Sequence, residues 1–433
     1  MLLPSLSLQF RVHTRVLLTL AIALVLTVGL WAEPKHRQLI GEAEAAMKAD
    51  NLPLMLEKAE AAVAERPDYP RYLMIAAIAQ AANNRPDDAF ATLGRAADLG
   101  VALNFARQPA FAKLHDRPEF AALQKRFAAN LQPVGSAALA FTLPNMTGII
   151  EGIARRATTG EFFFGDVHNR CIWRRDSQGN VTKFSADADG LFGAFGLAID
   201  EKRSVLYVAT SALPEMSGFT AADENKAGIA RYDLTTGKLI GLSLVAADGR
   251  KHVIGDLTIA PDGSVFAADS FSPIIWRLAP GTEVLDKFID DGDTYASPQG
   301  MAFTADGKFF YLTDYINGLF RIEVATKKSL RLTPPTGASF IGLDGLVLTP
   351  AGLIATQNSG NPVRLLRLTL DDSGEKVTAV KALVSGVAEM NDVALGCFAD
   401  GSYFFAGQSG WALFDAPTAT PPARTTTIFS LQP

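Results

Sequence analysis

The stretch that decides the fold is GDLTIAPDGSVFAADS, residues 255–270. It is typical of a β-hairpin, because two apolar runs flank the turn-forming pair Asp262-Gly263. A third apolar run, IIWRL (274–278), follows directly. Short strands joined in this way by tight turns are the content of one blade of a β-propeller.

Outward from this hairpin, the same pattern recurs in both directions along the chain. The related stretches begin at Glu151, Phe195, Gln299, Asp344 and Asn391, so the six starts are separated by 44, 60, 44, 45 and 47 residues. This repeat predicts a mainly β protein with a six-bladed β-propeller over residues 149–433. A β-sandwich or a β-helix would not repeat a unit of this length. The C-terminal run TTTIFSLQP (425–433) completes the last blade or lends a strand that closes the ring.

The segment before the propeller predicts a small all-α domain over residues 35–130. Its composition is rich in Ala, Glu, Leu and Arg, and residues 48–64 align within residues 81–98 after a shift of 34 residues. Asp50 then falls on Asn84, Met55 on Ala89 and Ala62 on Ala96. The pattern resembles a tetratricopeptide helical hairpin. Because two such units bury little surface alone, we expect the domain to pack on the propeller or on a partner protein. Residues 131–148 are interpreted as a linker.

The N-terminus predicts export. Arg11 and Arg15 precede the uncharged apolar run Val16–Ala32, which fits either a signal peptide or a membrane anchor within residues 1–32. Cleavage after Ala32 stays open. Because the arginines remain on the cytoplasmic side, the rest of the chain is expected in the periplasm, free or anchored to the inner membrane. Contact with the membrane is expected only through this segment.

Composition excludes several classes of protein. The chain has 40 Lys+Arg against 45 Asp+Glu, so it lacks the basic surface of a nucleic-acid-binding protein. Its two cysteines, Cys171 and Cys397, lie in apolar runs and are expected as buried free thiols. The sequence contains no G-x-x-x-x-G-K-[ST], no H-E-x-x-H and no G-x-S-x-G motif, so nucleotide and serine-hydrolase chemistry lack support.

Polar side chains are expected to converge on one mouth of the central channel. Each repeat begins with the innermost strand of a blade, and the second strand returns to the same face. Oxygen ligands from separate blades can therefore meet at one cation, and Glu151, Gln299 and Asp344 are the predicted metal ligands. Asp256, Asn358 and Asn391 are the predicted substrate-binding residues. The insert 211–226 is expected to lie over this face, as a lid would.

Other polar residues are interpreted structurally. Asp166, Asp269 and Asp314 close second strands, where aspartates mostly cap hairpins or accept backbone hydrogen bonds. His252 has no evident partner, so a satisfied or solvated histidine is the preferred interpretation.

The propeller region resembles the gluconolactonase and senescence-marker-protein (regucalcin) family of six-bladed propellers. The resembling stretches are Glu151-Gly152, Gly255–Gly263, Pro298–Gly300 and Asp344–Leu346. The resemblance implies a divalent metal held by a glutamate, two asparagines and an aspartate, with the aspartate as candidate base. Glu151 and Asp344 match two of these positions, and Asp344 is therefore the predicted catalytic residue. Gln299 and Gly255 stand at the two asparagine positions.

Calcium is the favoured metal, because it accepts six to eight oxygens in flexible geometry and no His or Cys reaches the ring. Two function classes follow. One is a metal-dependent hydrolase of a lactone or related small ester. The other is a non-catalytic binding or scaffold propeller in the cell envelope, with a small-molecule ligand and a protein partner on the helical domain. The Glu151 and Asp344 pair favours the hydrolase, whereas Gly255 and Gln299 favour the second class.

Overall fold

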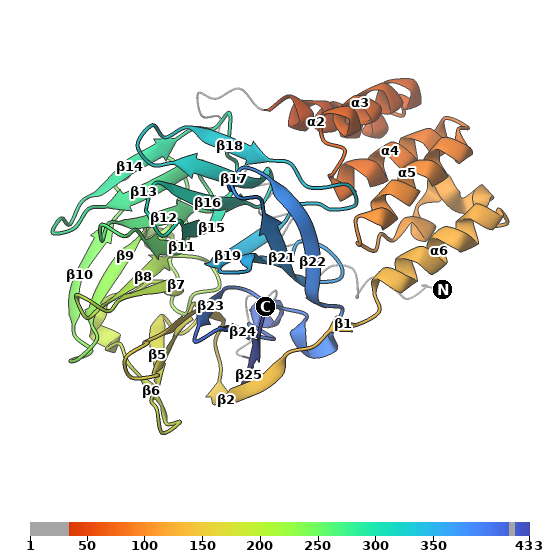
Figure 1. Cartoon of the computed structure of the whole chain (residues 1–433). Helices are drawn as coiled ribbons and strands as arrows, with labels where there is room; N and C mark the ends of the chain where they lie inside the picture. The colour runs from red at the N-terminus through yellow and green to blue at the C-terminus, as the bar shows by residue number, and fades with distance from the viewer. Residues whose placement is uncertain (1–33, 415–420) are drawn as a thin grey trace, which may run out of the picture.

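The computed structural model describes residues 34–414 and 421–433. Within them, six antiparallel sheets are arranged as the blades of a ring, as Figure 1 shows. The six-bladed propeller predicted from the repeat is therefore confirmed. Successive strands of a blade pair with their sequence neighbours, so each blade is a meander whose first strand lies at the channel.

The first three blades follow the predicted repeat directly. Their strands are, for the first blade, β3 (Ile150–Arg155), β4 (Phe162–Asp166), β5 (Cys171–Arg175) and β6 (Val181–Lys183); for the second, β7 (Gly193–Asp200), β8 (Val205–Ser211), β9 (Ala227–Asp233) and β10 (Leu239–Leu244); and for the third, β11 (Ile254–Ile259), β12 (Val265–Asp269), β13 (Ile274–Leu278) and β14 (Leu285–Asp290).

The remaining blades include two strands from outside the repeat. Their strands are, for the fourth blade, β15 (Pro298–Phe303), β16 (Phe309–Asp314), β17 (Gly318–Glu323) and β18 (Ser329–Leu332); for the fifth, β19 (Leu343–Thr349), β20 (Gly352–Gln357), β21 (Arg364–Leu370), β22 (Val377–Ser385) and β1 (Val134–Gly135); and for the sixth, β23 (Gly396–Ala399), β24 (Ser402–Ala406), β25 (Arg424–Leu431) and β2 (Ala138–Met146).

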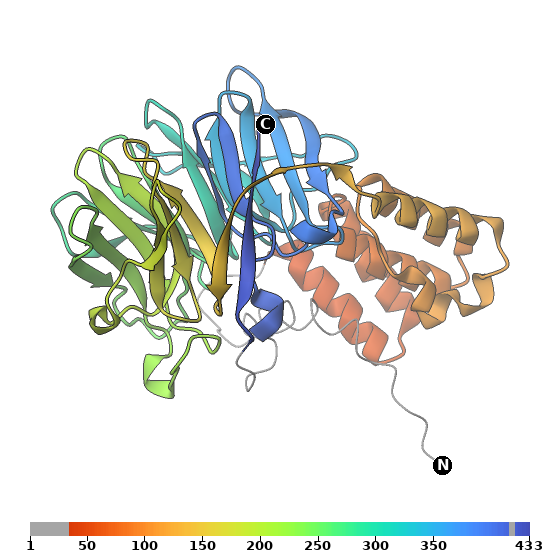
Figure 2. The same cartoon turned by 90° about the horizontal axis from the view of Figure 1, so that it is seen from below.

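The ring is closed by the segment that the sequence suggested was a linker. Residues 131–148 contain β1, which pairs with β22, and β2, which pairs antiparallel with β25. Figure 2 shows β2 running beside β25 on the outside of the last blade. The sixth blade thus combines a strand from before the repeat with three strands from the end of the chain. Pairing the two ends of the described chain in one sheet ties the ring together.

The helical domain consists of two antiparallel hairpins and a final helix. Asp50 and Asn84 lie in the two turns that connect the helices of each hairpin, and both have a positive φ, 54° and 58°. This conformation favours Asn and Asp among the residues with side chains. Ala62 and Ala96, also related by the shift, are fully buried, so the repeat of 34 residues is structural. The helices are α2 (Lys35–Lys48), α3 (Leu52–Glu65), α4 (Pro70–Ala82), α5 (Pro86–Asp98) and α6 (Pro118–Asn130), with the short 3₁₀ helices η1 (Phe105–Arg107) and η2 (Pro109–Leu114) before α6.

This domain packs on the fourth and fifth blades, beside β17, β18, β21 and β22 in Figure 1. Arg66 in the α3–α4 turn donates to the carbonyl of Asn317, at 3.3 Å. The carbonyl of Leu99 accepts a hydrogen bond from Arg364, at 2.9 Å. Of the two expected alternatives, packing on the propeller or on a partner protein, the structure shows the first.

The predicted export segment, residues 1–32, lies outside the described residues. Among the helices that the structure does describe, we find none of the length and apolar character that a membrane crossing requires. Cys171 is buried and Cys397 half-buried, and both are free thiols.

Candidate functional site

Five blades share a β-bulge at the start of the innermost strand. The pairing between the first and second strands shifts after Ile150, Ala194, Ile254, Pro298 and Leu343. A bulge re-aims the side chain of its extra residue. The residues that follow directly are those that the repeat analysis singled out: Glu151, Phe195, Gly255, Gln299 and Asp344.

The next position explains how closely the inner strands approach. Glycine occupies it in four blades, and a Cβ on Gly152 would lie 2.2 Å from the carbonyl oxygen of Phe195. In the third blade this position holds Asp256. A Cβ on Gly196, in the second blade, would lie only 2.3 Å from Asp256 Oδ1. The Asp256 carboxylate also accepts the Leu257 N–H at 2.8 Å. The third blade thus presents its side chain one residue later than its neighbours.

Glu151 is held by a residue from the far end of the chain. Its carboxylate accepts a hydrogen bond from the indole N–H of Trp411. Trp411 belongs to the 3₁₀ helix η6 (Trp411–Phe414), in the segment between β24 and β25, and its ring centroid lies 6.3 Å from that of Phe195. Glu151 is only 8% exposed, so its side chain sits between the first blade and an aromatic cover.

Asp344 is oriented by an amide. Asn358 donates to Asp344 Oδ2 at 2.7 Å and to the carbonyl of Val393 at 3.2 Å. The hydroxyl of Tyr315 donates to the Asn358 carbonyl oxygen at 3.0 Å. Asn358 was predicted to bind substrate; the structure places it beside Asp344, where it fixes one carboxylate oxygen.

The three acids of this mouth resist ionisation. Burial raises the pKa of Glu151 well above its ordinary value, and the nearby charge of Asp344 adds to the effect, while the Trp411 hydrogen bond opposes it. Burial raises the pKa of Asp344 to about 6, against the Asn358 hydrogen bond. Burial raises the pKa of Asp256 to about 8, against the Leu257 N–H. Each prefers a proton or a cation to a bare charge.

These acids lack a basic partner within the part of the chain that the structure describes. Among residues 34–414 and 421–433, no Lys, Arg or His forms an ion pair with Glu151, Asp256 or Asp344. A buried carboxylate without a partner is costly. The missing positive charge is therefore left to a ligand or to protons.

The third and fourth blades offer amide and hydroxyl groups instead. The Gln299 carbonyl oxygen accepts from the Ser270 hydroxyl, and its amide donates to Ser297 Oγ, both at 3.0 Å. A Cβ on Gly255 would lie 2.6 Å from Ser270 Oγ and 3.6 Å from Gln299 Oε1. The Ser270 hydroxyl therefore fills the space that a side chain at position 255 would need.

Asn391 is bonded to a residue outside this group. It is exposed at the end of the 3₁₀ helix η5 (Ala388–Met390), and its carbonyl oxygen accepts from Gln408 at 3.3 Å. The prediction that Asn391 opens an innermost strand is wrong, because β23 begins five residues later, at Gly396. Its neighbour Asp392 bridges to Gln408 and contributes negative charge near Glu151.

The insert between β8 and β9 packs on the loop after β4. The Glu215 carbonyl lies 2.6 Å from His168 Nδ1, and the Ser217 N–H donates to the His168 carbonyl. Met216 is buried with Phe192. In Figure 2 this insert and η6 project on the same side of the ring. The insert therefore belongs to the face of the candidate site, over the first two blades.

The strand-end aspartates have structural partners. Asp166 and Asp269 accept the indole N–H of Trp173 and Trp276 at 3.0 and 3.1 Å, and Asp314 accepts four backbone N–H groups. The structural interpretation of these residues is confirmed. Of the two alternatives for His252, the structure shows the satisfied histidine, since its ring nitrogens lie 2.6 Å from Asp269 and 2.9 Å from Asp248.

A cation at this mouth would meet an open donor set. In the described part of the chain no three His, Cys, Asp or Glu side chains are grouped as metal ligands. The protein offers two carboxylates, Glu151 on the first blade and Asp344 on the fifth, and the side-chain carbonyl of Gln299 on the fourth blade. Such a set fits a hard cation that keeps several waters, as Mg²⁺ and many Ca²⁺ sites do, and it does not fit a closed cage.

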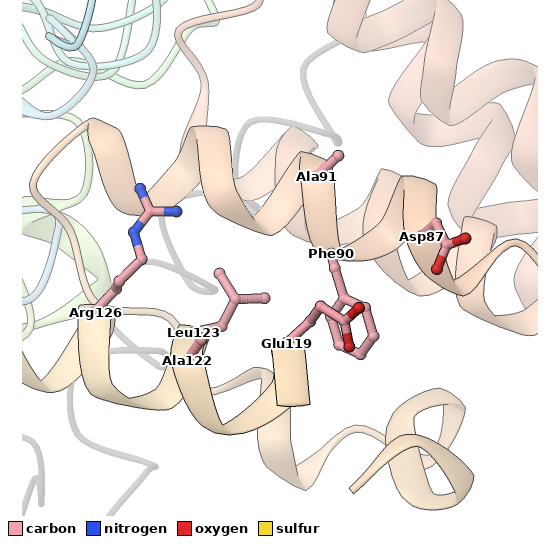
Figure 3. A pocket seen from close by; sticks show the side chains of 7 residues that line it. All are labelled: Asp87, Phe90, Ala91, Glu119, Ala122, Leu123 and Arg126. Atoms are coloured by element: carbon pink, nitrogen blue, oxygen red, sulfur yellow. The ribbon is translucent and has the colours of Figure 1, made fainter. Parts of the chain in front are cut away.

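A separate pocket lies within the helical domain. It has a volume of about 360 Å³ and lies between α5 and α6. Figure 3 shows Phe90 and Leu123 pointing into the space, with Asp87 toward one end and Arg126 toward the other. Arg126 also pairs with Asp98. The pocket combines an apolar floor with charged ends.

Trp411 and Tyr315 were not predicted as site residues from the sequence. Both lie outside the recurring strands, Trp411 in an insertion and Tyr315 in the loop between β16 and β17. The one available signal was the length of the segment between β24 and β25, which exceeds a hairpin turn.

Comparisons with known proteins extend only to the fold. No protein-family profile matches the chain, and no curated protein matches it in sequence. The solved structures that resemble it include gluconolactonase-like and regucalcin-like propellers. A gluconolactonase from Xanthomonas campestris has 15% identity and a TM-score of 0.45, and the match covers 68% of this chain and 91% of that one. A calcium-binding protein, regucalcin, from Agrobacterium tumefaciens has 16% identity and a TM-score of 0.46, covering 69% and 95%.

A lyase is found at the same level of similarity. Virginiamycin B lyase from Staphylococcus aureus has 12% identity and a TM-score of 0.44, and the match covers 69% of this chain and 98% of the other. Similarity of this size transfers neither an activity nor a ligand, because one fold serves many functions. The six-bladed architecture of this chain rests on its own strand pairing.

Proposed function

We propose that the channel mouth is the site of a cation-dependent hydrolase that opens a lactone or a related small ester. The observation that carries the proposal is the pair Glu151 and Asp344. The two residues occupy equivalent bulges in the first and fifth blades. Burial raises the pKa of both carboxyl groups, and no basic side chain of the described residues forms an ion pair with either. Calcium or magnesium would supply the missing charge, and when bound it would polarise the ester carbonyl.

Side chains of the protein would supply the base and would exclude water. Asn358 occupies Asp344 Oδ2, so Oδ1 is left to accept a proton from an attacking water. Burial raises the pKa of Asp344, whereas a bound cation would lower it, so the carboxylate would be ionised near neutral pH and able to act as the base. Trp411 holds one Glu151 oxygen and, with Phe195, supplies an apolar wall that excludes water from one side.

The test uses the full-length protein and a panel of γ- and δ-lactones and phenyl esters, with acid release followed by a pH indicator. We expect hydrolysis to stop on chelation and to return with Ca²⁺ or Mg²⁺. Asp344→Asn should lower kcat by about 100-fold or more, the usual cost of losing a general base. Asp372→Asn removes an exposed carboxylate from the same blade and should change nothing. Absence of hydrolysis, or an unchanged rate in the Asp344 variant, would contradict the proposal.

A second candidate is a non-catalytic binding propeller of the cell envelope. Gly255 offers no ligand, and both ends of the Gln299 amide are already bonded to serines, which favours recognition over catalysis. The pocket between α5 and α6 gives the helical domain a place to receive a partner.

Export itself is tested by fusing a reporter that is active only outside the cytoplasm to the C-terminus.

A further inference from the structure

The turn between α3 and α4 holds a loop of the fourth blade. The Asn317 carbonyl accepts from Arg66 at 3.3 Å and from Arg331 at 2.9 Å. Arg331 also reaches Asp68 at 3.4 Å. Arg66 and Asp68 are 5% and 8% exposed, so the contact is buried. Residues 314–317, which include Tyr315, are therefore anchored by the helical domain.

A second contact holds the neighbouring loop of the fifth blade. Arg364 donates to the Leu99 carbonyl and to Gln357 Oε1, both at 2.9 Å. The Ala102 N–H donates to the Asn361 carbonyl at 2.7 Å. The helical domain therefore contacts this loop directly at Asn361, and it reaches Gln357, the residue before Asn358, through Arg364.

The two loops meet at Asn358, whose amide is fully used. Its carbonyl oxygen accepts from Tyr315, and its two N–H groups go to Asp344 and to the Val393 carbonyl. The Asp344 carboxylate and the Val393 carbonyl are both acceptors, so they require the N–H₂ end of the amide to face them. The Tyr315 hydroxyl holds the opposite, oxygen end, and without it one of the three hydrogen bonds that fix the Asn358 amide is lost.

We propose that Tyr315 is a positioning residue for Asp344, that it acts through Asn358, and that the helical domain sets its place. The inference rests on the proposed hydrolase for its effect on rate, but its geometry stands alone. It gives the helical domain a role in the chemistry of the propeller without a contact to substrate.

The first experiment compares Tyr315→Phe with Tyr311→Phe in the full-length protein. Tyr311 lies in the same blade, and its hydroxyl donates to the Gly374 carbonyl at 3.0 Å, so each variant removes a part-buried hydroxyl that donates to a carbonyl oxygen. Tyr315→Phe should lower kcat about tenfold with little change in KM, the usual size for a residue that orients a ligand. Tyr311→Phe should leave both constants unchanged. Equal effects of the two variants would overturn the role of Tyr315.

The second readout needs no activity. Asparagine labelled with ¹⁵N reports the side-chain amide of Asn358, assigned by its loss in Asn358→Ser. The two amide protons should be widely separated and slow to exchange in the unmutated protein. In Tyr315→Phe the two resonances should move closer together and exchange faster, because the amide keeps the acceptors of its N–H groups but loses the hydrogen bond to its oxygen. In Tyr311→Phe they should stay unchanged. If they stay unchanged in both, the positioning chain is absent, whether or not the protein hydrolyses lactones.

The helical domain is tested with Arg66→Gln against Arg71→Gln. Arg71 lies on α4 in an exposed pair with Glu44, so its loss controls for charge. Arg66→Gln should shift the Asn358 resonances and lower kcat about threefold, a typical energetic coupling through a packed contact. If Arg66→Gln behaves like Arg71→Gln, the domain does not set the place of Tyr315. If the unmutated protein has no activity, the hydrolase fails and the resonances alone decide this inference.

Discussion

Two sets of acids in the same propeller have opposite surroundings. At the ends of second strands, Asp269 accepts three backbone N–H groups, an indole and a histidine. At the starts of first strands, Asp344 accepts one amide donor and Asp256 one backbone N–H. Asp269 is fully buried, whereas Asp256 and Asp344 are half-buried. The difference lies in the number of donors that replace the lost water.

We infer that this difference separates structural acids from the acids of the candidate site, which we call the functional set. A carboxylate surrounded by donors stabilises the fold, since its hydrogen bonds offset the cost of burial. A carboxylate that is buried with few donors costs stability, as the raised pKa of Asp256 and Asp344 shows. Stability is kept low at such positions where function needs the charge.

The largest expected effect is on the structural set. Asp269→Ala leaves three backbone N–H groups, Trp276 and His252 without their acceptor. We expect a loss of about 3–5 kcal/mol in the free energy of unfolding, measured with urea, as for other broken buried networks.

The matched change on the functional set is Asp344→Asn. It keeps the shape of the side chain and removes an uncompensated charge, so we expect stability to be unchanged or higher by about 1 kcal/mol. If Asp344→Asn destabilises as much as Asp269→Ala, the division of the acids into two sets is wrong.

A middle-sized effect sharpens the comparison within the mouth. Gly255→Asn places a Cβ 2.6 Å from Ser270 Oγ, and we expect a loss of about 1–3 kcal/mol from overpacking. Adding Ser270→Ala removes that oxygen and leaves the Ser270 Cβ at 3.9 Å, an ordinary contact. The double variant should regain stability and bind Ca²⁺ more tightly, because it adds an amide oxygen to the open donor set.

Calorimetric titration of Ca²⁺ into the single and double variants measures this change. Ser270→Ala alone is the control, since it frees the same space without a new ligand. Equal affinity in the control and the double variant would show that the 255 position does not face the bound cation.

The sequence predicted the fold because each blade carries its own strands and turns. The bulge residues Glu151, Gln299 and Asp344 fell at equivalent places for the same reason. Asn391 did not, because the sixth blade inserts η5 and a bridge at Asp392 before its inner strand. Trp411 and Tyr315 reach the site from segments that do not repeat, and only folding brings them there. The partners of His252 likewise come from separate segments, at Asp248 and Asp269.

The smallest expected effect is on the pH dependence of stability, and Asp256 isolates it. Its pKa is about 8 in the folded protein and about 4 in an unfolded chain. Between these values the folded state binds a proton that the unfolded state lacks, so this group's contribution is present at low pH and is lost as pH rises toward 8.

Asp256→Asn should therefore flatten the fall in stability between about pH 4 and 8, measured as the urea midpoint at each pH. The effect is modest, because a half-buried side chain keeps part of its hydration. His252 contributes a fall of its own, since its aspartate partners raise its pKa against the effect of burial, but it is present in both proteins and cancels in the difference. Asp372→Asn is the control and should leave the curve unchanged. A parallel curve for Asp256→Asn would mean that this carboxylate is as well solvated as an exposed one, and would move it out of the functional set.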